Sequence, residues 1–245
     1  MIDIHCHILP EVDDGAKSWE IAVEMCRLAS ADGIEHIVAT PHANERYAYD
    51  REDLECALAE LRRRVGATPT FSLGCDFHLS YENLKDVKLH PDRYSIGGTP
   101  YLLVELSDFS IPPRVDDSML RLGDLGLTPV LTHPERNPIL QQNLGRVVRL
   151  AEQGFVVQIT ASSLTGSWGE RARRSARWLL ESGAVHVLAT DAHDSKHRIP
   201  NLSAGRDAAA EICGPEVAQA LVDANPRAII HGLPLPYFPA PVVKG

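Results

Sequence analysis

A closed α/β barrel around a parallel sheet is the fold that this sequence predicts, and two patterns predict it. First, β-type runs and helical segments alternate about seven times along the chain, an order typical of parallel sheets covered by helices. Second, most of the predicted strands end in a polar residue suited to an active site. In a barrel all strand ends contribute to the site, whereas an open sheet uses only those near its switch point. We therefore expect a distorted (β/α)7, TIM-like barrel that forms a single domain over residues 1–245.

The first half of the chain alternates β-type runs with two helical segments. Strands are expected at residues 1–4, 36–40 and 70–79, and helices between Ser18 and Asp32 and over 51–65. Ser18 is a suitable N-cap for the first helix, and Asp32-Gly33 ends it. The polar stretch up to about Gly98 is expected to be loop with short helical turns.

The second half repeats the alternation with short connections. Strands are expected at residues 101–106, 128–132, 155–159 and 185–190, and helices at 115–125, about 140–153 and about 170–182. Each of these helices stops at a glycine, namely Gly126, Gly154 and Gly183. One or two helices are expected in the tail, before a proline-rich end that lies across the surface.

Charge and composition exclude several classes of protein. The net charge of −9 argues against nonspecific nucleic-acid binding, although it does not exclude a phosphate substrate, because metal ions supply local positive charge. Neither an apolar run long enough for a membrane span nor a signal-peptide pattern is present in the sequence. The five cysteines are scattered and odd in number, as in reduced thiols. We expect a cytoplasmic protein without nucleic-acid binding or membrane insertion.

The opening sequence MIDIHCHILPEVDD suggests a metal site. His5 and His7 project from the same face of a strand, and further His, Asp and Glu residues follow at the ends of the other predicted strands. The complete candidate set is His5, His7, Asp14, His42, Asp76, Glu105, His133, Asp191 and His193. Nitrogen and oxygen ligands without a thiolate suit Mn²⁺, Fe or Zn²⁺. Because the set exceeds the needs of one ion, we expect two or three ions.

Two arginines follow these strand ends and favour a phosphate substrate. Arg136 lies three residues after His133, and Arg198 lies five after His193. Guanidinium forks match phosphate oxygens in bidentate fashion. Clustered ions hold phosphoryl oxygens and lower the pKa of a water nucleophile. We therefore expect a metal-dependent phosphomonoesterase in which Arg136 and Arg198 bind the phosphate.

The motifs DIHCHILPEVDDGA, ATPH, LTHPERN, TDAH and NPRAIIHG resemble those of the polymerase and histidinol phosphatase (PHP) superfamily. Within it they are similar to the manganese-dependent tyrosine-protein phosphatases of the CpsB/CapC type. The resemblance implies a distorted (β/α)7 barrel with three Mn²⁺ ions, in which a metal-activated hydroxide attacks a phosphotyrosine. It also implies a partner, the tyrosine-rich tail of a bacterial tyrosine kinase that controls capsule or exopolysaccharide export.

The resemblance also implies how the ligands are shared among the ions. The first ion takes His5, His7, Asp76 and Asp191, the second takes Asp76, Glu105 and His133, and the third takes Asp14, His42 and His193. Asp76 is a departure, because the family has Glu at this bridging position. Its shorter side chain is expected to alter the ion spacing or weaken one site.

Other functions of the same residues stay open. A small-molecule phosphatase, such as a histidinol-phosphate phosphatase, needs the same site. A phosphodiesterase or nuclease is disfavoured by the acidic charge, and a regulator that binds phosphotyrosine without turnover is a further alternative. Oligomeric state does not follow from the sequence.

Several neighbouring residues are expected to have other roles. Asp13, Glu135 and Asn137 are expected to order loops, and His78 to pack beside the cleft. Cys56 and Arg62 have the Cys-x5-Arg spacing of cysteine-dependent tyrosine phosphatases. Their segment has no glycine and is predicted to be a helix, so its amides are not free to bind a phosphate. We expect Cys56 to have no catalytic role.

Overall fold

A computed structural model describes residues 1–112 and 114–242, so the last three residues of the domain expected over 1–245 lie outside the described part. Its strands are β1 (Ile2–Cys6), β2 (His36–Ala39), β3 (His42–Ala43), β4 (Thr70–Leu73), β5 (Asp76–His78), β6 (Tyr101–Glu105), β7 (Thr128–Thr132), β8 (Val156–Thr160) and β9 (Val187–Ala189). All pair in parallel, in two sheets of order β1-β2-β4 and β3-β5-β6-β7-β8-β9.

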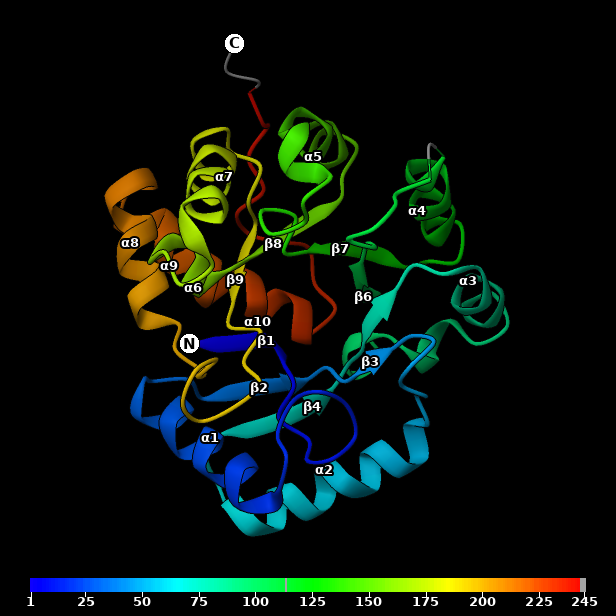
Figure 1. The fold of residues 1–245 in the computed structure, drawn as a ribbon, viewed down its shortest axis with the longest axis vertical. Helices are drawn as coiled ribbons and strands as arrows, with labels where there is room; N and C mark the ends of the chain where they lie inside the picture. The colour runs from blue at the N-terminus through cyan, green and yellow to red at the C-terminus, as the bar shows by residue number, and fades with distance from the viewer. Residues whose placement is uncertain (113, 243–245) are drawn as a thin grey trace.

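The two sheets close into one barrel (Figure 1). β2 and β3 are separated only by Thr40-Pro41, and β4 and β5 only by Gly74-Cys75, so each pair is one interrupted strand. β9 returns to β1 through a bridge between Cys6 and Ala192 and a hydrogen bond from His7 N to Ala192 O of 2.9 Å. Counting each interrupted pair once leaves seven strand positions, so the predicted distorted (β/α)7 barrel is confirmed.

Helices surround the strands (Figure 1). The α-helices are α1 (Trp19–Ala31), α2 (Arg51–Val65), α3 (Tyr81–Val87), α4 (Val115–Gly123), α5 (Leu144–Glu152), α6 (Ala161–Leu164), α7 (Gly169–Glu181), α8 (Ser203–Cys213), α9 (Pro215–Val222) and α10 (Ala224–Ile230). Short 3-10 turns cover η1 (Pro91–Arg93), η2 (Ile96–Gly98) and η3 (Leu140–Gln142). Ser18 caps α1 as predicted, its side chain accepting from Ile21 N.

Four details differ from the predicted elements. The strand expected over 70–79 is interrupted at Gly74, where a Cβ would press on Val38 and Ile96. The helix expected from about residue 140 begins as η3, and α5 starts only at Leu144. The short helix α6 was not predicted, because four residues are too few for a helical period. The tail holds three helices instead of one or two, since Gly214-Pro215 separates α8 from α9.

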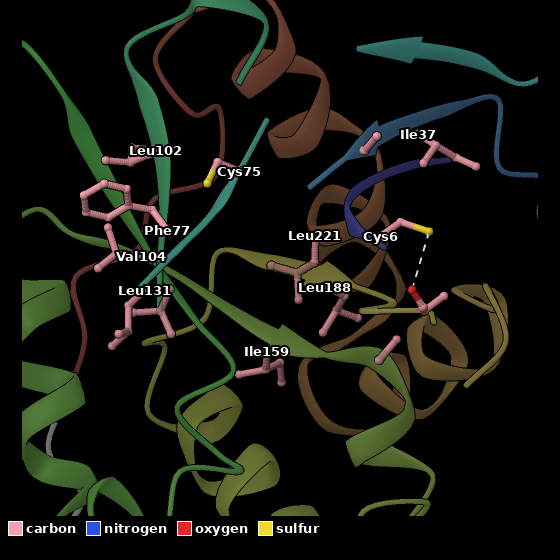
Figure 2. Close-up of a cluster of buried hydrophobic side chains, with 14 of the residues drawn as sticks. Cys6, Ile37, Cys75, Phe77, Leu102, Val104, Leu131, Ile159, Leu188 and Leu221 are labelled. Carbon is pink, nitrogen blue, oxygen red and sulfur yellow. Dashed lines mark hydrogen bonds between the residues drawn. The ribbon is translucent and has the colours of Figure 1, made fainter. Parts of the chain in front are cut away.

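Strand residues on the outer face of the barrel pack against the helices. Figure 2 shows this cluster, in which side chains such as Leu102, Val104 and Leu131 lie together, with Leu221 contributed by α9. They alternate along each strand with residues that face inward. The outer cluster therefore joins the helices to the barrel, and a separate set of side chains fills the inside of the barrel.

The barrel interior is apolar at one end and polar at the other. The apolar end is formed by the second buried cluster, including Leu103, Val130 and Val156, and Ile229 of α10 closes it. Two residues further along the same strands, the inward positions are Glu105, Thr132 and Gln158. Because parallel strands end at the same side, these polar residues meet at the carboxyl end of the barrel.

β1 departs from simple alternation. Its register against β2 shifts between Asp3 and Cys6, as in a β-bulge. Ile4 belongs to the inner apolar cluster, yet the adjacent His5 faces the polar end, where it contacts Gln158 and His7. The bulge thus lets one strand supply both the apolar floor and two polar side chains.

The proline-rich end runs along the outside of the barrel, as predicted. Leu233 O accepts from the Tyr101 hydroxyl (2.7 Å), Tyr237 O accepts from Asn225 (2.7 Å), and Val242 N donates to Ser182 O (2.9 Å). Within residues 1–112 and 114–242, no helix combines the length and apolarity needed to cross a bilayer.

Candidate metal centre

The polar end of the barrel holds a cluster of His, Asp and Glu side chains, here called the ligand cluster. Its members are His5, His7, Asp14, His42, Asp76, Glu105, His133, Asp191 and His193. They come from the ends of β1, β6, β7 and β9, from β3 and β5, and from the loop after β1. Nine positions spread over the chain are therefore brought together by strand closure, and each of them was a predicted ligand.

Two imidazoles and two carboxylates form the most buried part of the ligand cluster. The Nε2 atoms of His5 and His7 lie 3.2 Å apart, and each lies 3.3 Å from Asp191 Oδ1. His5 Nε2 also lies 3.6 Å from Asp76 Oδ2. All four side chains are nearly inaccessible to solvent.

Asp14 joins two further histidines at the more open side. Its Oδ1 lies 3.4 Å from His42 Nε2 and 3.4 Å from His193 Nε2. The ligand atoms of these three residues and of His7 lie within 4.8 Å of one another. This spacing brings the predicted ligand Asp14 to the ring of His7, which the family assignment placed at a different ion.

Asp76 connects this side to Glu105 and His133. Its Oδ2 lies 3.2 Å from His42 Nδ1, and His42 Nδ1 lies 3.8 Å from Glu105 Oε2. His133 Nε2 lies 3.9 Å from Glu105 Oε1. Within the described residues, Asp76 Oδ2 and His42 Nδ1 are buried without a hydrogen-bond partner. Unpaired buried polar atoms are costly, and a cation between them satisfies both.

Three histidines are held so that Nε2 points into the ligand cluster. His7 Nδ1 lies 2.7 Å from Asp13 Oδ2, His5 Nδ1 lies 3.0 Å from Gln158 Oε1, and His193 Nδ1 lies 3.0 Å from the Asp191 carbonyl. These oxygens only accept, so each Nδ1 carries a proton, and each Nε2 offers a lone pair to the ligand cluster once any second proton has left. Metal-binding histidines are typically oriented in this way.

Asp13 and Gln158 were not predicted as supports of the ligands. Asp13 was expected to order the loop, and it does so by accepting from Gly15 N (2.8 Å) and His42 N (3.2 Å) while it also holds His7. A side chain at Gly15 would overlap the His7 carbonyl oxygen, so this loop needs glycine there. Gln158 could have been singled out in the sequence because it is the polar residue of an otherwise apolar predicted strand.

The three aspartates of the ligand cluster are held in the ionised form that binds metals. Burial by itself would raise the pKa of Asp76 and Asp191, but neighbouring cations, His5 for the former and Arg136 for the latter, keep both well below the usual range. The nearby rings of His193 and His42, whose Nε2 atoms each lie 3.4 Å from Asp14 Oδ1, likewise lower the pKa of Asp14. Burial and the nearby Asp76 raise the pKa of Glu105.

The histidines divide into two groups. Burial lowers the pKa of His193 to about 4 and that of His133 well below its usual range, so both are neutral at pH 7. For His7 and His42 burial acts in the same direction, but Asp13 beside His7 and Asp14 beside His42 raise their pKa values to about 9 and about 11. A divalent ion displaces protons from such histidines. The ligand cluster therefore fits cations that prefer nitrogen and oxygen donors.

Both predicted arginines meet at Asp191. Arg136 donates to Asp191 Oδ2 at 2.5 Å and Arg198 at 2.6 Å. Arg198 Nε is buried and has no partner within the described residues. A cavity of about 480 Å³ opens beside Asp191 and Arg198. One carboxylate thus links the ligand cluster to two guanidinium groups at the edge of a hollow.

The other predicted residues lie where expected. Glu135 orders its loop by accepting from Thr160 N, and Asn137 does the same by accepting from Ile139 N. His78 lies beside the cluster, with Nδ1 3.3 Å from Glu105 Oε2. Cys56 is exposed in the middle of α2, which confirms that its segment is a helix.

We expect Asp13→Asn to weaken Mn²⁺ binding about 10- to 100-fold, the usual effect of losing an outer partner of a metal ligand. The amide keeps the size of the carboxylate, but it no longer attracts the proton at His7 Nδ1. Titration calorimetry with Mn²⁺ measures the effect, and Asp53→Asn at the exposed start of α2 is the control. Unchanged Mn²⁺ affinity in Asp13→Asn contradicts this role.

The chain is similar to known proteins over most of its length. Residues 1–231 match the family model described as capsular polysaccharide synthesis, CpsB/CapC. The tyrosine-protein phosphatase YwqE of Bacillus subtilis (strain 168) is 34% identical over 201 residues, which cover 81% of this chain and 79% of YwqE. The tyrosine-protein phosphatase CpsB of Streptococcus pneumoniae is 28% identical over 239 residues, covering 94% of this chain and 98% of CpsB.

Solved structures agree with this assignment. A chain from the crystal structures of YwqE from Bacillus subtilis and CpsB from Streptococcus pneumoniae, described as metal-dependent tyrosine phosphatases, superposes with a TM-score of 0.92 at 30% identity, and 100% of each chain is covered. The dihydropyrimidinase of Brevibacillus agri matches at a TM-score of 0.52 and 11% identity over 93% of this chain and 69% of its own. That second likeness concerns the fold alone.

Proposed function

The chain belongs to the CpsB/CapC family of capsular polysaccharide synthesis, and from this premise we propose that it is a metal-dependent protein-tyrosine phosphatase. One observation supports the proposal above all. Asp191 contacts His5 and His7 through Oδ1 and both arginines through Oδ2. A metal site and an anion site thus adjoin at one carboxylate, and hydrolysis of a phosphate monoester uses both metal ions and groups that bind the phosphoryl oxygens.

The nine residues of the ligand cluster are proposed to hold two or three Mn²⁺ ions. The proposed sharing is that implied by the family resemblance: His5, His7, Asp76 and Asp191 at one ion, Asp76, Glu105 and His133 at the second, and Asp14, His42 and His193 at the third. Oxygen and nitrogen donors suit Mn²⁺, and also Fe and Zn²⁺. Asp76 lies within one candidate ligand group with His5 and His7 and within another that includes Glu105, which supports a bridging role in spite of its short side chain.

When bound, divalent ions supply Lewis acidity toward phosphoryl oxygens and lower the pKa of water toward neutrality. The chain itself provides the rest of the site. Arg136 and Arg198 each use part of the guanidinium fork on Asp191, and the remaining N–H groups are proposed to bind phosphoryl oxygens. Asp191 fixes the direction of both forks, and Asp13 keeps the His7 proton at Nδ1, away from the ligand cluster.

The proposed substrate is phosphotyrosine in a protein, and the proposed partner is the tyrosine-rich tail of a bacterial tyrosine kinase. This follows the relatives, which are named tyrosine-protein phosphatases. A role in capsule or exopolysaccharide production follows the family description. We further propose that the chain acts as a single phosphoesterase domain in the cytoplasm.

A substrate comparison tests the proposal. We expect the purified, Mn²⁺-loaded protein to hydrolyse a phosphotyrosine peptide with a kcat/KM at least about tenfold above that for histidinol phosphate or bis-p-nitrophenyl phosphate, because a difference of about 1.4 kcal/mol in transition-state binding is sufficient for this ratio. Higher efficiency on histidinol phosphate indicates a small-molecule phosphatase. Preference for the diester indicates a phosphodiesterase.

We expect Cys56→Ser to retain wild-type turnover. The thiol lies on the exposed side of α2, whose amides are hydrogen-bonded within the helix, so it does not act as a nucleophile. The measurement is the rate on the same phosphotyrosine peptide, with helical content checked by circular dichroism. A folded but inactive Cys56→Ser protein contradicts the metal-dependent mechanism.

A further inference from the structure

Trp168 differs from the other two tryptophans in what surrounds its ring. Trp19 and Trp178 both pack against the main apolar cluster, whereas Trp168 belongs to neither apolar cluster of the described residues. Its side chain is 37% exposed. Packing in the apolar core therefore does not account for the position of this ring.

The groups that cover the Trp168 ring are two guanidiniums. The central carbon of Arg136 lies 4.0 Å from the ring centroid, and that of Arg198 lies 5.0 Å from it. Both distances are within the range of a cation–π interaction, for which tryptophan is the best partner and arginine the usual cation. The ring therefore contacts both arginines that also meet at Asp191.

The backbone around Trp168 holds its ring in place. Trp168 Nε1 donates to Ser162 Oγ at 3.1 Å, and Ser167 N donates to Ser162 O at 3.1 Å. Gly166 and Gly169 have φ of +91° and +82° on either side of the ring. These conformations are strained for other residues, so the turn that presents Trp168 is specified by the sequence.

The same turn is tied to the loop of Arg136. Glu135, the preceding residue, is fully buried and accepts from Thr160 N (3.0 Å) and Ser163 Oγ (2.7 Å), at the start of α6. α6 in turn carries Ser162, the partner of Trp168. The position of the ring relative to Arg136 is thus restrained by two buried hydrogen bonds of Glu135 and by the exposed bond between Trp168 and Ser162.

We propose that Trp168 is a positioning residue that orients Arg136 and Arg198 for binding of the substrate phosphate. The proposal rests on the proposed phosphatase function. Asp191 Oδ2 accepts from one nitrogen of each guanidinium, so each guanidinium plane can still rotate about that hydrogen bond. The flat ring restrains this rotation, so the remaining N–H groups face one phosphate. The ring also lines the cavity beside Asp191 and Arg198.

Steady-state kinetics and phosphate binding test the proposal. For Trp168→Leu we expect the KM for a phosphotyrosine peptide and the inhibition constant of inorganic phosphate to rise together by about tenfold, because two cation–π contacts are lost. We expect kcat to stay within about threefold, since the ligand cluster is intact. Trp168→Phe keeps an aromatic face and is expected to restore both constants to within about threefold of wild type.

Trp19→Leu is the matched control. It removes a cation–π contact with Arg64, whose guanidinium carbon lies 4.5 Å from the ring, and this contact joins α1 to α2 without a member of the ligand cluster. We expect its KM and phosphate inhibition to equal those of the wild type. Thermal unfolding of each variant with Mn²⁺ separates a folding defect from a binding defect, and Trp168→Phe provides the test if Trp168→Leu does not fold.

A double-mutant cycle with Arg136→Ala distinguishes positioning from a general structural role. If Trp168 acts through the arginines, Trp168→Leu should raise the inhibition constant of phosphate by about threefold in the Arg136→Ala background, instead of about tenfold in the wild type. The reason is that the effects of substitutions at contacting residues are not additive. Full additivity overturns the proposal, and so does a phosphate inhibition constant that is unchanged in Trp168→Leu.

Direct calorimetric binding of inorganic phosphate separates the two proposals. If the wild type binds phosphate with the expected dependence on Trp168 but does not hydrolyse phosphotyrosine, the positioning role stands and the proposed function is wrong. If it hydrolyses phosphotyrosine with no dependence on Trp168, the positioning role is wrong and the proposed function stands.

Discussion

Asp191→Asn is expected to lower kcat on a phosphotyrosine peptide by about a thousandfold, because loss of an outer ligand partner alone costs about 10- to 100-fold and loss of a charge-stabilising group costs about 100- to 1000-fold. Asp191 combines both roles. Its Oδ1 lies 3.3 Å from the Nε2 atoms of His5 and His7, and its Oδ2 accepts from Arg136 and Arg198. The amide removes the negative charge on which all four contacts depend.

Asparagine is the appropriate replacement at this position. Asp191 has a φ of +50°, in the left-handed region, which asparagine tolerates better than most residues. Asp191→Asn should therefore fold, and alanine adds backbone strain to the loss of charge. The measurements are kcat, Mn²⁺ content and circular dichroism. Asp207→Asn, at an exposed ion pair with Arg206, is the control. Retention of a tenth or more of wild-type kcat in Asp191→Asn contradicts its place at the centre of the site.

Removal of divalent ions is expected to abolish turnover, and His7→Ala is expected to prevent its recovery. A chelator should inactivate the wild type, and Mn²⁺ should restore it. His7 Nε2 belongs to two of the three ligand groups, one with Asp14, His42 and His193 and the other with His5 and Asp76. Its loss therefore removes a ligand from both, so that added Mn²⁺ should not rescue the variant.

Thermal unfolding gives a readout of this prediction that does not depend on activity. An ion that binds only the folded state at a free concentration of about 100 Kd adds about 2.7 kcal/mol to the free energy of unfolding. We expect Mn²⁺ to raise the melting temperature of the wild type much more than that of His7→Ala. His36→Ala, which loses hydrogen bonds to Thr70 and Ser72 outside the ligand cluster, is the control. Equal stabilisation of His7→Ala and the wild type would exclude His7 as a ligand.

The barrel could be predicted because its signals are local. The composition of a strand and the glycine that ends a helix can each be recognised within a few residues of sequence. The polar residue at the end of each strand then marks the same side of the barrel. His133 directly follows β7, and Asp191 follows β9 after one intervening residue. α6 was missed because its four residues are stabilised by Glu135, from a different loop.

Local pattern was also sufficient for the chemistry of the site. The sequence names the His, Asp and Glu residues at the predicted strand ends, and these residue types determine the donor atoms. Parallel strands bring their carboxyl ends together whatever the details of packing. The presence of two arginines next to these positions likewise needed no structure. The sequence by itself therefore determined the composition of the site and the side of the barrel on which it lies.

The tertiary structure decided which atoms meet. The bulge in β1 allows Ile4 and His5 both to face inward, contrary to simple alternation. Asp13 and Gln158 orient His7 and His5 although Gln158 is 153 residues from its partner. Trp168 reaches Arg136 and Arg198 only through the turn after α6. These contacts depend on register and on distances between remote segments, which strand and helix periodicity do not specify.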